Sequence, residues 1–116
     1  MQYRPFGKIG SVSSLGFGCM RLPTGEDGHI DESLAIPLLR RGYALGINYF
    51  DTAYYYCNEE SQYVVGRAVK PFRDQILLSR SSRSATLRIV YSSGKRWKSS
   101  FAVWIRPTST SIISMR

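Results

Sequence analysis

The stretch that decides the fold is residues 46–59, which read Gly46-Ile47-Asn48-Tyr49-Phe50-Asp51-Thr52-Ala53-Tyr54-Tyr55-Tyr56-Cys57-Asn58-Glu59. Residues 47–50 predict a short strand, and the carboxylate of Asp51 follows at its carboxyl end. The phenol of Tyr56 comes five residues later in the same loop. Parallel α/β folds do their chemistry at the carboxyl ends of strands, so both groups are candidate catalytic residues. A lone aspartate there is more often a turn or cap residue, and the surrounding motif favours catalysis.

Helices are predicted on both sides of this stretch. Before it, Asp31 or Ser33 offers an N-cap for a helix that runs to about residue 46. Pro37 leaves open whether the regular helix begins only at that proline or the residue before it. After the stretch, acidic residues open a second helix over 58–69, where its dipole favours them.

The remaining segments complete an alternation of strands and helices. Residues 3–18 predict a small hairpin that leads into a first strand, and residues 75–79 form a compact apolar run suited to a parallel strand. The order is hairpin, strand, helix, strand, helix, strand, with short connections. This order indicates βαβ units, a parallel sheet and the α/β class.

Charge divides the chain near residue 80. The 116 residues carry a formal net charge of +8, from 16 Lys+Arg and 8 Asp+Glu. All eight acids lie in residues 1–79, where eight basic residues balance them, whereas residues 80–116 hold eight basic residues and no acid. A Ser- and Arg-rich tail without acids is typical of solvated, disordered or irregular chain. Residues 103–105 and residues 112–113 can form short extended pieces, but the sequence shows no partner for them.

Composition also indicates where the chain is located in the cell and whether it binds a metal. No apolar run reaches the roughly 18 residues that a membrane span needs, and the amino terminus does not resemble a targeting segment. Cys19 and Cys57 are therefore expected to be free thiols of a cytoplasmic protein. His29 has no partner at metal-ligand spacing, so we expect a solvated histidine and no metal site.

Two separated motifs resemble those of the aldo/keto reductase family. The pattern of residues 46–59 looks like the family signature, and a second motif is similar to the first strand of one bacterial branch: Leu15-Gly16-Phe17-Gly18-Cys19-Met20-Arg21-Leu22-Pro23. The resemblance covers about residues 1–79. It implies the amino-terminal part of a (β/α)₈ TIM barrel, because a complete barrel needs roughly 250 residues.

The resemblance also implies a chemistry, which is hydride transfer from NADPH to a small aldehyde or ketone substrate. By this analogy Tyr56 is the general acid, and Asp51 is a buried carboxylate that holds a catalytic lysine. A phenol with a pKa near 10 is a poor acid at neutral pH unless a nearby cation favours its phenolate. Gly18, Met20 and Asp51 are implied to line the cofactor site and the substrate mouth.

The chain departs from the family pattern where the lysine is due. The pattern continues the last strand as Ser-Thr-Lys-Leu-Pro, whereas this chain reads Ser79-Arg80-Ser81-Ser82-Arg83. Shifting the codons by one base permits Lys-Leu-Pro from 80–83. The same shift forces Glu from Trp97-Lys98 and Asp from Trp104-Ile105, as the family requires. We hypothesise that a one-base insertion or deletion near codons 79–80 left a partial reductase domain at 1–79 and an out-of-frame tail at 80–116.

An unclosed barrel exposes apolar helix faces and a bare sheet edge. We therefore expect this chain to be a truncated aldo/keto reductase that folds poorly, aggregates and lacks reductase activity. Two other classes stay open. One is a small basic module that binds RNA or acidic lipid without specificity, which retention on heparin tests. The other is a fragment that docks on an intact reductase, which co-purification tests.

Overall fold

The structure is a computed structural model, and it describes residues 1–81, 87–91 and 103–105. The elements run in the order β1 (Tyr3–Pro5), η1 (Gly7–Ile9), β2 (Ser11–Ser13), β3 (Phe17–Gly18), α1 (Glu32–Ala44), β4 (Tyr49–Ala53), α2 (Ser61–Val69), η2 (Lys70–Gln75), β5 (Leu77–Ser81), β6 (Leu87–Tyr91) and β7 (Val103–Ile105). The predicted alternation of hairpin, strand and helix is confirmed as far as β5.

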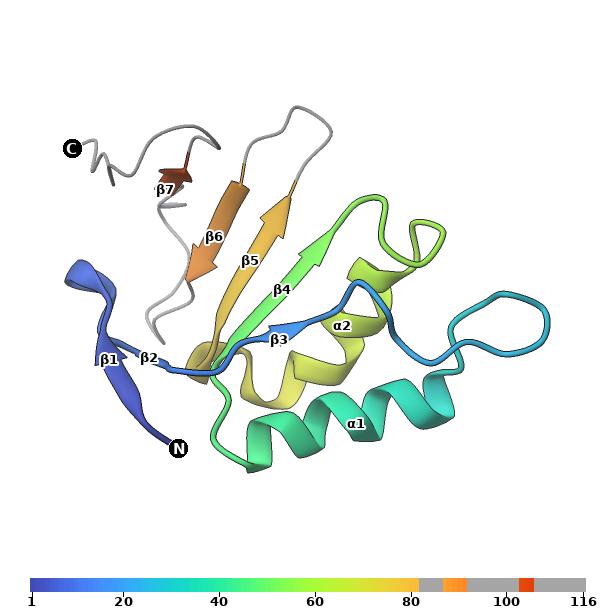
Figure 1. Cartoon of the computed structure of the whole chain (residues 1–116), viewed down its shortest axis with the longest axis horizontal. Helices are drawn as coiled ribbons and strands as arrows, with labels where there is room; N and C mark the ends of the chain where they lie inside the picture. The colour runs from blue at the N-terminus through green and yellow to red at the C-terminus, as the bar shows by residue number, and fades with distance from the viewer. Residues whose placement is uncertain (82–86, 92–102, 106–116) are drawn as a thin grey trace.

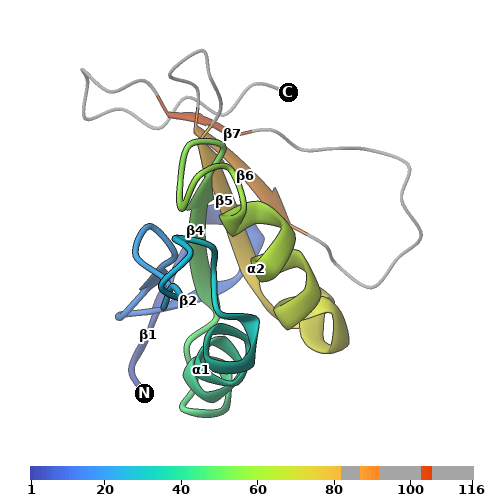
Figure 2. The ribbon, with the colours of Figure 1, turned by 90° about the vertical axis from the view of Figure 1, so that its right-hand side faces the viewer.

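The main sheet has the strand order β3-β4-β5-β6-β7. Strands β3, β4 and β5 are parallel, and α1 and α2 provide the crossovers between them. Both helices cover the same face of this sheet (Figure 2). Consecutive β/α units with their helices on one face are the repeating unit of a (β/α)₈ barrel. Over the described residues the units form an open sheet, which is a fragment of such a barrel.

Two pieces of the basic tail are regular, where the sequence predicted irregular chain. Strand β6 pairs antiparallel with β5, from Leu77 opposite Tyr91 to Ser81 opposite Leu87. Strand β7, the piece at residues 103–105 for which no partner was expected, pairs with β6. The edge of β5 is therefore covered and not bare (Figure 1). Long-range pairing supplies these strands with hydrogen bonds that no local pattern predicts.

Helix α1 begins at Glu32, five residues before Pro37, so the proline lies inside the helix. Asp31 is its N-cap, and its Oδ1 accepts a hydrogen bond from the Ser33 backbone N–H at 2.9 Å. Pro37 is the sixth residue of α1, beyond the first four N–H groups that lack a partner within a helix, so it costs one backbone hydrogen bond without ending the helix. The aspartate cap thus decides the helix start that the sequence left open.

The core lies between the sheet and the two helices. Phe50 of β4 and Leu39 of α1 are fully buried in it, and a Cβ on Gly42 would lie 2.7 Å from the ring of Phe17. Helix α1 therefore lies directly on β3, where only a glycine fits. The remaining core residues are Cys19, Leu22, Ile30, Ala35, Ile47, Val64, Val65, Ala68, Val69, Phe72 and Ile76. Neither described helix is long and apolar enough to cross a membrane.

The β1–β2 hairpin lies at the amino end of β4. The Asn48 side chain joins them, because its Oδ1 accepts from the Ser13 backbone N–H at 2.7 Å and its Nδ2 donates to the Ser11 carbonyl at 3.0 Å. The hairpin thus lies at the end of the sheet opposite to Asp51 and the loop that follows β4.

Candidate active site at the carboxyl end of β4

The structure brings Asp51 and Tyr56 together. Asp51 is the third residue of β4 and lies in register with Gly18 of β3 and Ser79 of β5. Tyr56 follows in a turn, in which its backbone N–H donates to the Ala53 carbonyl at 3.3 Å. The phenol donates to Asp51 Oδ2 at 3.5 Å, the outer limit of a hydrogen bond. The acid and the phenol therefore face each other.

The second oxygen of Asp51 also accepts a hydroxyl. Ser79 Oγ donates to Oδ1 at 2.5 Å, and Ser79 is fully buried. The resemblance implied that Asp51 is buried, but its side chain is half-buried because it lies near the open carboxyl end of the sheet. Within residues 1–81 the ion pairs of the structure involve other carboxylates, so hydroxyl groups and not a cation contact Asp51.

This environment raises the pKa of Tyr56 above its ordinary value. Partial burial of the phenol contributes most, followed by the negative charge of Asp51 and the hydrogen bond to it. Burial and a neighbouring anion both disfavour the phenolate. The Tyr56 phenol therefore keeps its proton at neutral pH but releases it reluctantly, which is the opposite of what a general acid with a nearby cation would do.

The position that the family pattern reserves for lysine is Ser81, two residues after Ser79. Side chains two apart on a strand lie on the same face of a sheet. Ser79 contacts Asp51, so Ser81 lies on the face that carries Asp51 and Tyr56, one step nearer the carboxyl end. The intervening Arg80 is exposed on the other face. Ser81 thus occupies the position where the resemblance implied a lysine.

Gly18 is paired in register with Asp51, and Met20 follows two residues later. A Cβ on Gly18 would meet nothing within 4 Å, and Met20 is 55% exposed. This open surface fits the approach of a flat ring. Cys19 between them is a buried free thiol, and burial, with Asp51 and Cys57 nearby, raises its pKa to about 12. Among the residues described, no group of three or more His, Cys, Asp or Glu could hold a metal ion.

The acidic residues that follow Tyr56 do not open α2 as predicted. Residues 58–60 were expected to open α2, but the helix begins at Ser61. Cys57, Asn58 and Glu59 have positive φ angles of 50°, 53° and 70°, which are incompatible with a right-handed helix. Glu60, the next residue, instead binds the loop before α1. The hydroxyl of Ser79 was missed as well, although its register opposite Asp51 follows once the strands are aligned.

The fold and the site define an α/β-barrel fragment with a carboxylate and a phenol at a strand end. The model of the Aldo/keto reductase family matches residues 14–88. This match covers more than half of the chain, so the chain belongs to the aldo/keto reductase family.

Two relatives of known sequence support this family assignment. The uncharacterized oxidoreductase YqkF of Bacillus subtilis is 30% identical over 93 residues, which is 80% of this chain and 25% of that protein. Probable aldo-keto reductase 1 of Glycine max is 37% identical over 59 residues, which is 51% of this chain and 17% of that protein. The chain thus spans about a quarter or less of the length of these relatives.

A solved structure agrees as well. It is the aldo-keto reductase AKR11C1 from Bacillus halodurans in its holo form, with a TM-score of 0.60 and 33% identity. The similarity covers 91% of this chain and 30% of that one. The fold of the described residues is therefore that of the corresponding part of an aldo-keto reductase.

Proposed function

We propose that this chain is the amino-terminal part of an NAD(P)H-dependent reductase that converts a small aldehyde or ketone into an alcohol. One observation carries the proposal: the Tyr56 phenol faces the Asp51 carboxylate at the carboxyl end of β4. Family membership supports oxidoreductase chemistry. The nicotinamide cofactor, the carbonyl substrate and a cytoplasmic location are our extension of it.

The proposed chemistry assigns one task to each residue. The nicotinamide cofactor, when bound, supplies a hydride to the carbonyl carbon of the substrate. Tyr56 donates its phenolic proton to the carbonyl oxygen, which gains negative charge as the hydride arrives. Asp51 accepts a hydrogen bond from the phenol and, in a complete site, pairs with a lysine that stabilises the phenolate left behind. Gly18 leaves room for the ring, and Met20 offers an apolar contact at the mouth.

We further propose that the chain as printed lacks reductase activity. Without the cation, Asp51 and burial hold the pKa of Tyr56 above its ordinary value, so proton donation is disfavoured. The tail supports a break near residue 80: in a (β/α)₈ barrel a helix and then a parallel strand follow each strand, whereas antiparallel β6 follows β5 here. No observation on the described residues favours a basic binding module, so that alternative is not carried further.

The experiment is to resequence the DNA around codons 79–80 and to express the chain in the frame that restores a lysine. We expect this protein to oxidise NADPH in the presence of an aldehyde, and Tyr56→Phe to lower kcat by about 10²- to 10⁴-fold. Tyr55→Phe is the matched control, because that neighbouring phenol is 60% exposed and packs edge-on against Tyr54. If no single-base change yields a lysine, the frame hypothesis fails. If Tyr56→Phe keeps full activity, the catalytic assignment fails.

A further inference from the structure

The turn between Tyr56 and α2 has a strained backbone. Cys57, Asn58 and Glu59 are three consecutive residues with positive φ, and none of them is a glycine. Residues with a Cβ rarely adopt this left-handed conformation, and a run of them persists only where surrounding contacts fix it. The turn begins directly after the proposed proton donor, so whatever fixes it also bears on the position of the phenol.

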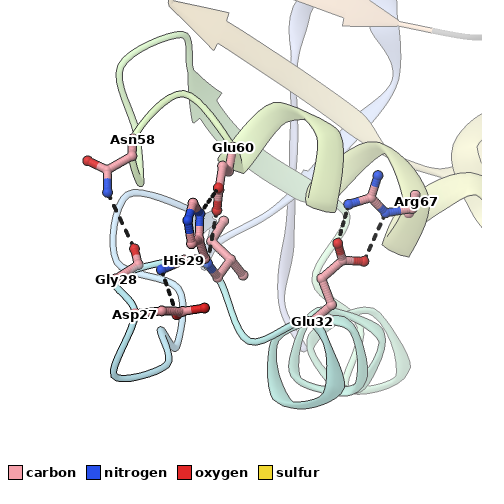
Figure 3. A network of polar contacts seen from close by, with 8 residues as sticks. Asp27, Gly28, His29, Glu32, Asn58, Glu60 and Arg67 are labelled. Carbon is pink, nitrogen blue, oxygen red and sulfur yellow. Dashed lines mark hydrogen bonds and ion pairs between the residues drawn. The ribbon is translucent and has the colours of Figure 1, made fainter.

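Two side chains tie the turn to residues 28–30, in the loop that precedes α1, while the Cys57 thiol donates to the Met20 carbonyl at 3.4 Å. The Asn58 side chain donates from Nδ2 to the Gly28 carbonyl at 3.3 Å. One oxygen of Glu60 accepts from the Ile30 backbone N–H at 2.9 Å, and the other pairs with His29 Nδ1 (Figure 3). We call the contacts of Glu60 with His29 and Ile30 the Glu60 clamp. The clamp joins the residue that precedes α2 to a loop about 30 residues earlier in the chain.

The clamp is connected to Tyr56 through the backbone. The Glu60 N–H donates to the Cys57 carbonyl at 3.0 Å, and the Ser61 N–H donates to the Tyr56 carbonyl at 3.3 Å. Ser61 is itself fixed, because its buried Oγ donates to the Cys19 carbonyl at 2.9 Å. Releasing Glu60 would let the turn relax while Ser61 stays in place. The backbone of Tyr56 keeps its bonds to Ala53 and Ser61, so the phenol side chain is the part that moves away from Asp51.

The charges around Glu60 stabilise the contacts of the clamp. The pKa of Glu60 is lowered by the Ile30 N–H and by His29, and the pKa of His29 is raised by Glu60. Asp27 Oδ1 accepts from the His29 backbone N–H at 3.0 Å and adds a second negative charge beside the ring. A hollow of about 320 Å³ is lined by the clamp and by a second ion pair, Glu32 with Arg67 (Figure 3).

We propose that Glu60 is a positioning residue for Tyr56: by fastening the start of α2 to the loop at 28–30, it maintains the left-handed turn and holds the phenol against Asp51. The proposal rests on the proposed function, because it matters for catalysis only if Tyr56 is the proton donor. The geometry it describes can be tested in the chain as it exists. Its readout is the ionisation of the phenol and not the rate of a reaction.

The test is a pH titration of the Tyr56 phenol by NMR in chains labelled with ¹³C-tyrosine, with Tyr56→Phe to assign the resonance. The chain is kept dilute, below the concentration at which light scattering begins. Glu60→Ala removes both contacts of the clamp, and Glu60→Gln keeps an acceptor for the Ile30 N–H but loses the charge. Glu32→Gln is the matched control, because it removes a carboxylate that lines the same hollow and whose described partner is Arg67.

We expect Glu60→Ala to lower the pKa of Tyr56 toward that of a solvated phenol, as contact with Asp51 is lost. This change corresponds to about a threefold or larger rise in the phenolate-to-phenol ratio at a fixed alkaline pH. Glu32→Gln should leave the titration unchanged. A folded Glu60→Ala chain with the wild-type titration overturns the proposal. If that variant does not fold, Glu60→Gln decides: a change in the same direction supports the clamp, and an unchanged titration overturns it.

The two proposals fail separately. An unchanged phenol titration removes the role of Glu60 and leaves the catalytic assignment of Tyr56 standing. Full activity of Tyr56→Phe in the frame-restored enzyme removes the catalytic assignment, while a response of the phenol to Glu60→Ala would still show that the clamp positions it.

Discussion

Replacing Ser81 with lysine places a cation where the fold has a position for one. Ser79 and Ser81 lie on the same face of β5, and Ser79 Oγ is 2.5 Å from Asp51 Oδ1. Two residues along a strand advance about 6.6 Å, a distance that the flexible four-carbon stem of a lysine can fold back across. The ammonium group of Ser81→Lys can therefore lie beside both Asp51 and the Tyr56 phenol.

The magnitude follows from the distance and the exposure of the site. Two unit charges 4 Å apart attract by about 1 kcal/mol in bulk water and about 4 kcal/mol near a protein surface. Asp51 and Tyr56 are half-buried, so the stabilisation of the phenolate should lie between these limits. It corresponds to a rise of about 5-fold to 10³-fold in the phenolate-to-phenol ratio at fixed pH. The lysine should therefore lower the pKa of Tyr56, whereas burial and Asp51 raise that pKa in the chain with Ser81.

The assay is the phenol titration of the dilute ¹³C-tyrosine chain. The chain holds eight tyrosines, so Tyr56→Phe in each background is needed to assign the resonance. Ser81→Met is the matched control, since its side chain has a similar length and no charge, and it should not lower the pKa of Tyr56. If Ser81→Lys and Ser81→Met titrate alike, the ammonium does not reach the phenol, and the inferred face of Ser81 is wrong.

Three further results are expected, each by a separate measurement. In denaturant unfolding, Gly42→Ala should lower the free energy of unfolding by about 1–2 kcal/mol, because its Cβ would lie 2.7 Å from an aromatic ring. Gly66→Ala in α2 meets nothing within 4 Å and should raise the free energy of unfolding by about 0.5–1 kcal/mol. Equal effects would contradict the packing of α1 on β3. In light scattering, Leu34→Glu should raise the concentration at which the chain aggregates, because Leu34 is 58% exposed on α1 and an acid suits a helix start; an unchanged onset removes that face as the cause. In native thiol alkylation, Cys57 should react and Cys19 should not, because Cys19 is fully buried with a raised pKa; labelling of both would contradict the described core.

Elements with a strong local pattern could be predicted from the sequence. The hairpin, α1, β4 and β5 each combine apolar periodicity with nearby turn or cap residues, and these signals do not depend on distant contacts. The pairing of Asp51 with Tyr56 was also predictable, because both belong to one strand end and one short loop. A few residues of backbone keep the two groups close in space, although the exact position of the phenol is proposed to depend on Glu60 and the loop at 28–30.

Features fixed by distant contacts could not be predicted. Glu60 looks like a first-turn acid of α2, and only the loop at 28–30 shows that its carboxylate has other partners. The left-handed turn at 57–59 has no glycine to indicate it. The pairing of β6 with β5 and of β7 with β6 is marked by no turn or strand motif in the tail. Residues 112 and 113, considered as a further extended piece, lie outside the described residues. In each case the deciding interaction crosses a long stretch of sequence.

The most direct measurement is the phenol titration of Tyr56 in the printed chain and in Asp51→Asn. Asparagine keeps the size of the side chain and removes its charge, so the part of the raised pKa that is due to the carboxylate should vanish while the part due to burial remains. We predict that Tyr56 ionises at a lower pH in Asp51→Asn than in the wild-type chain. Identical titrations in two folded chains would show that the carboxylate and the phenol do not form one site.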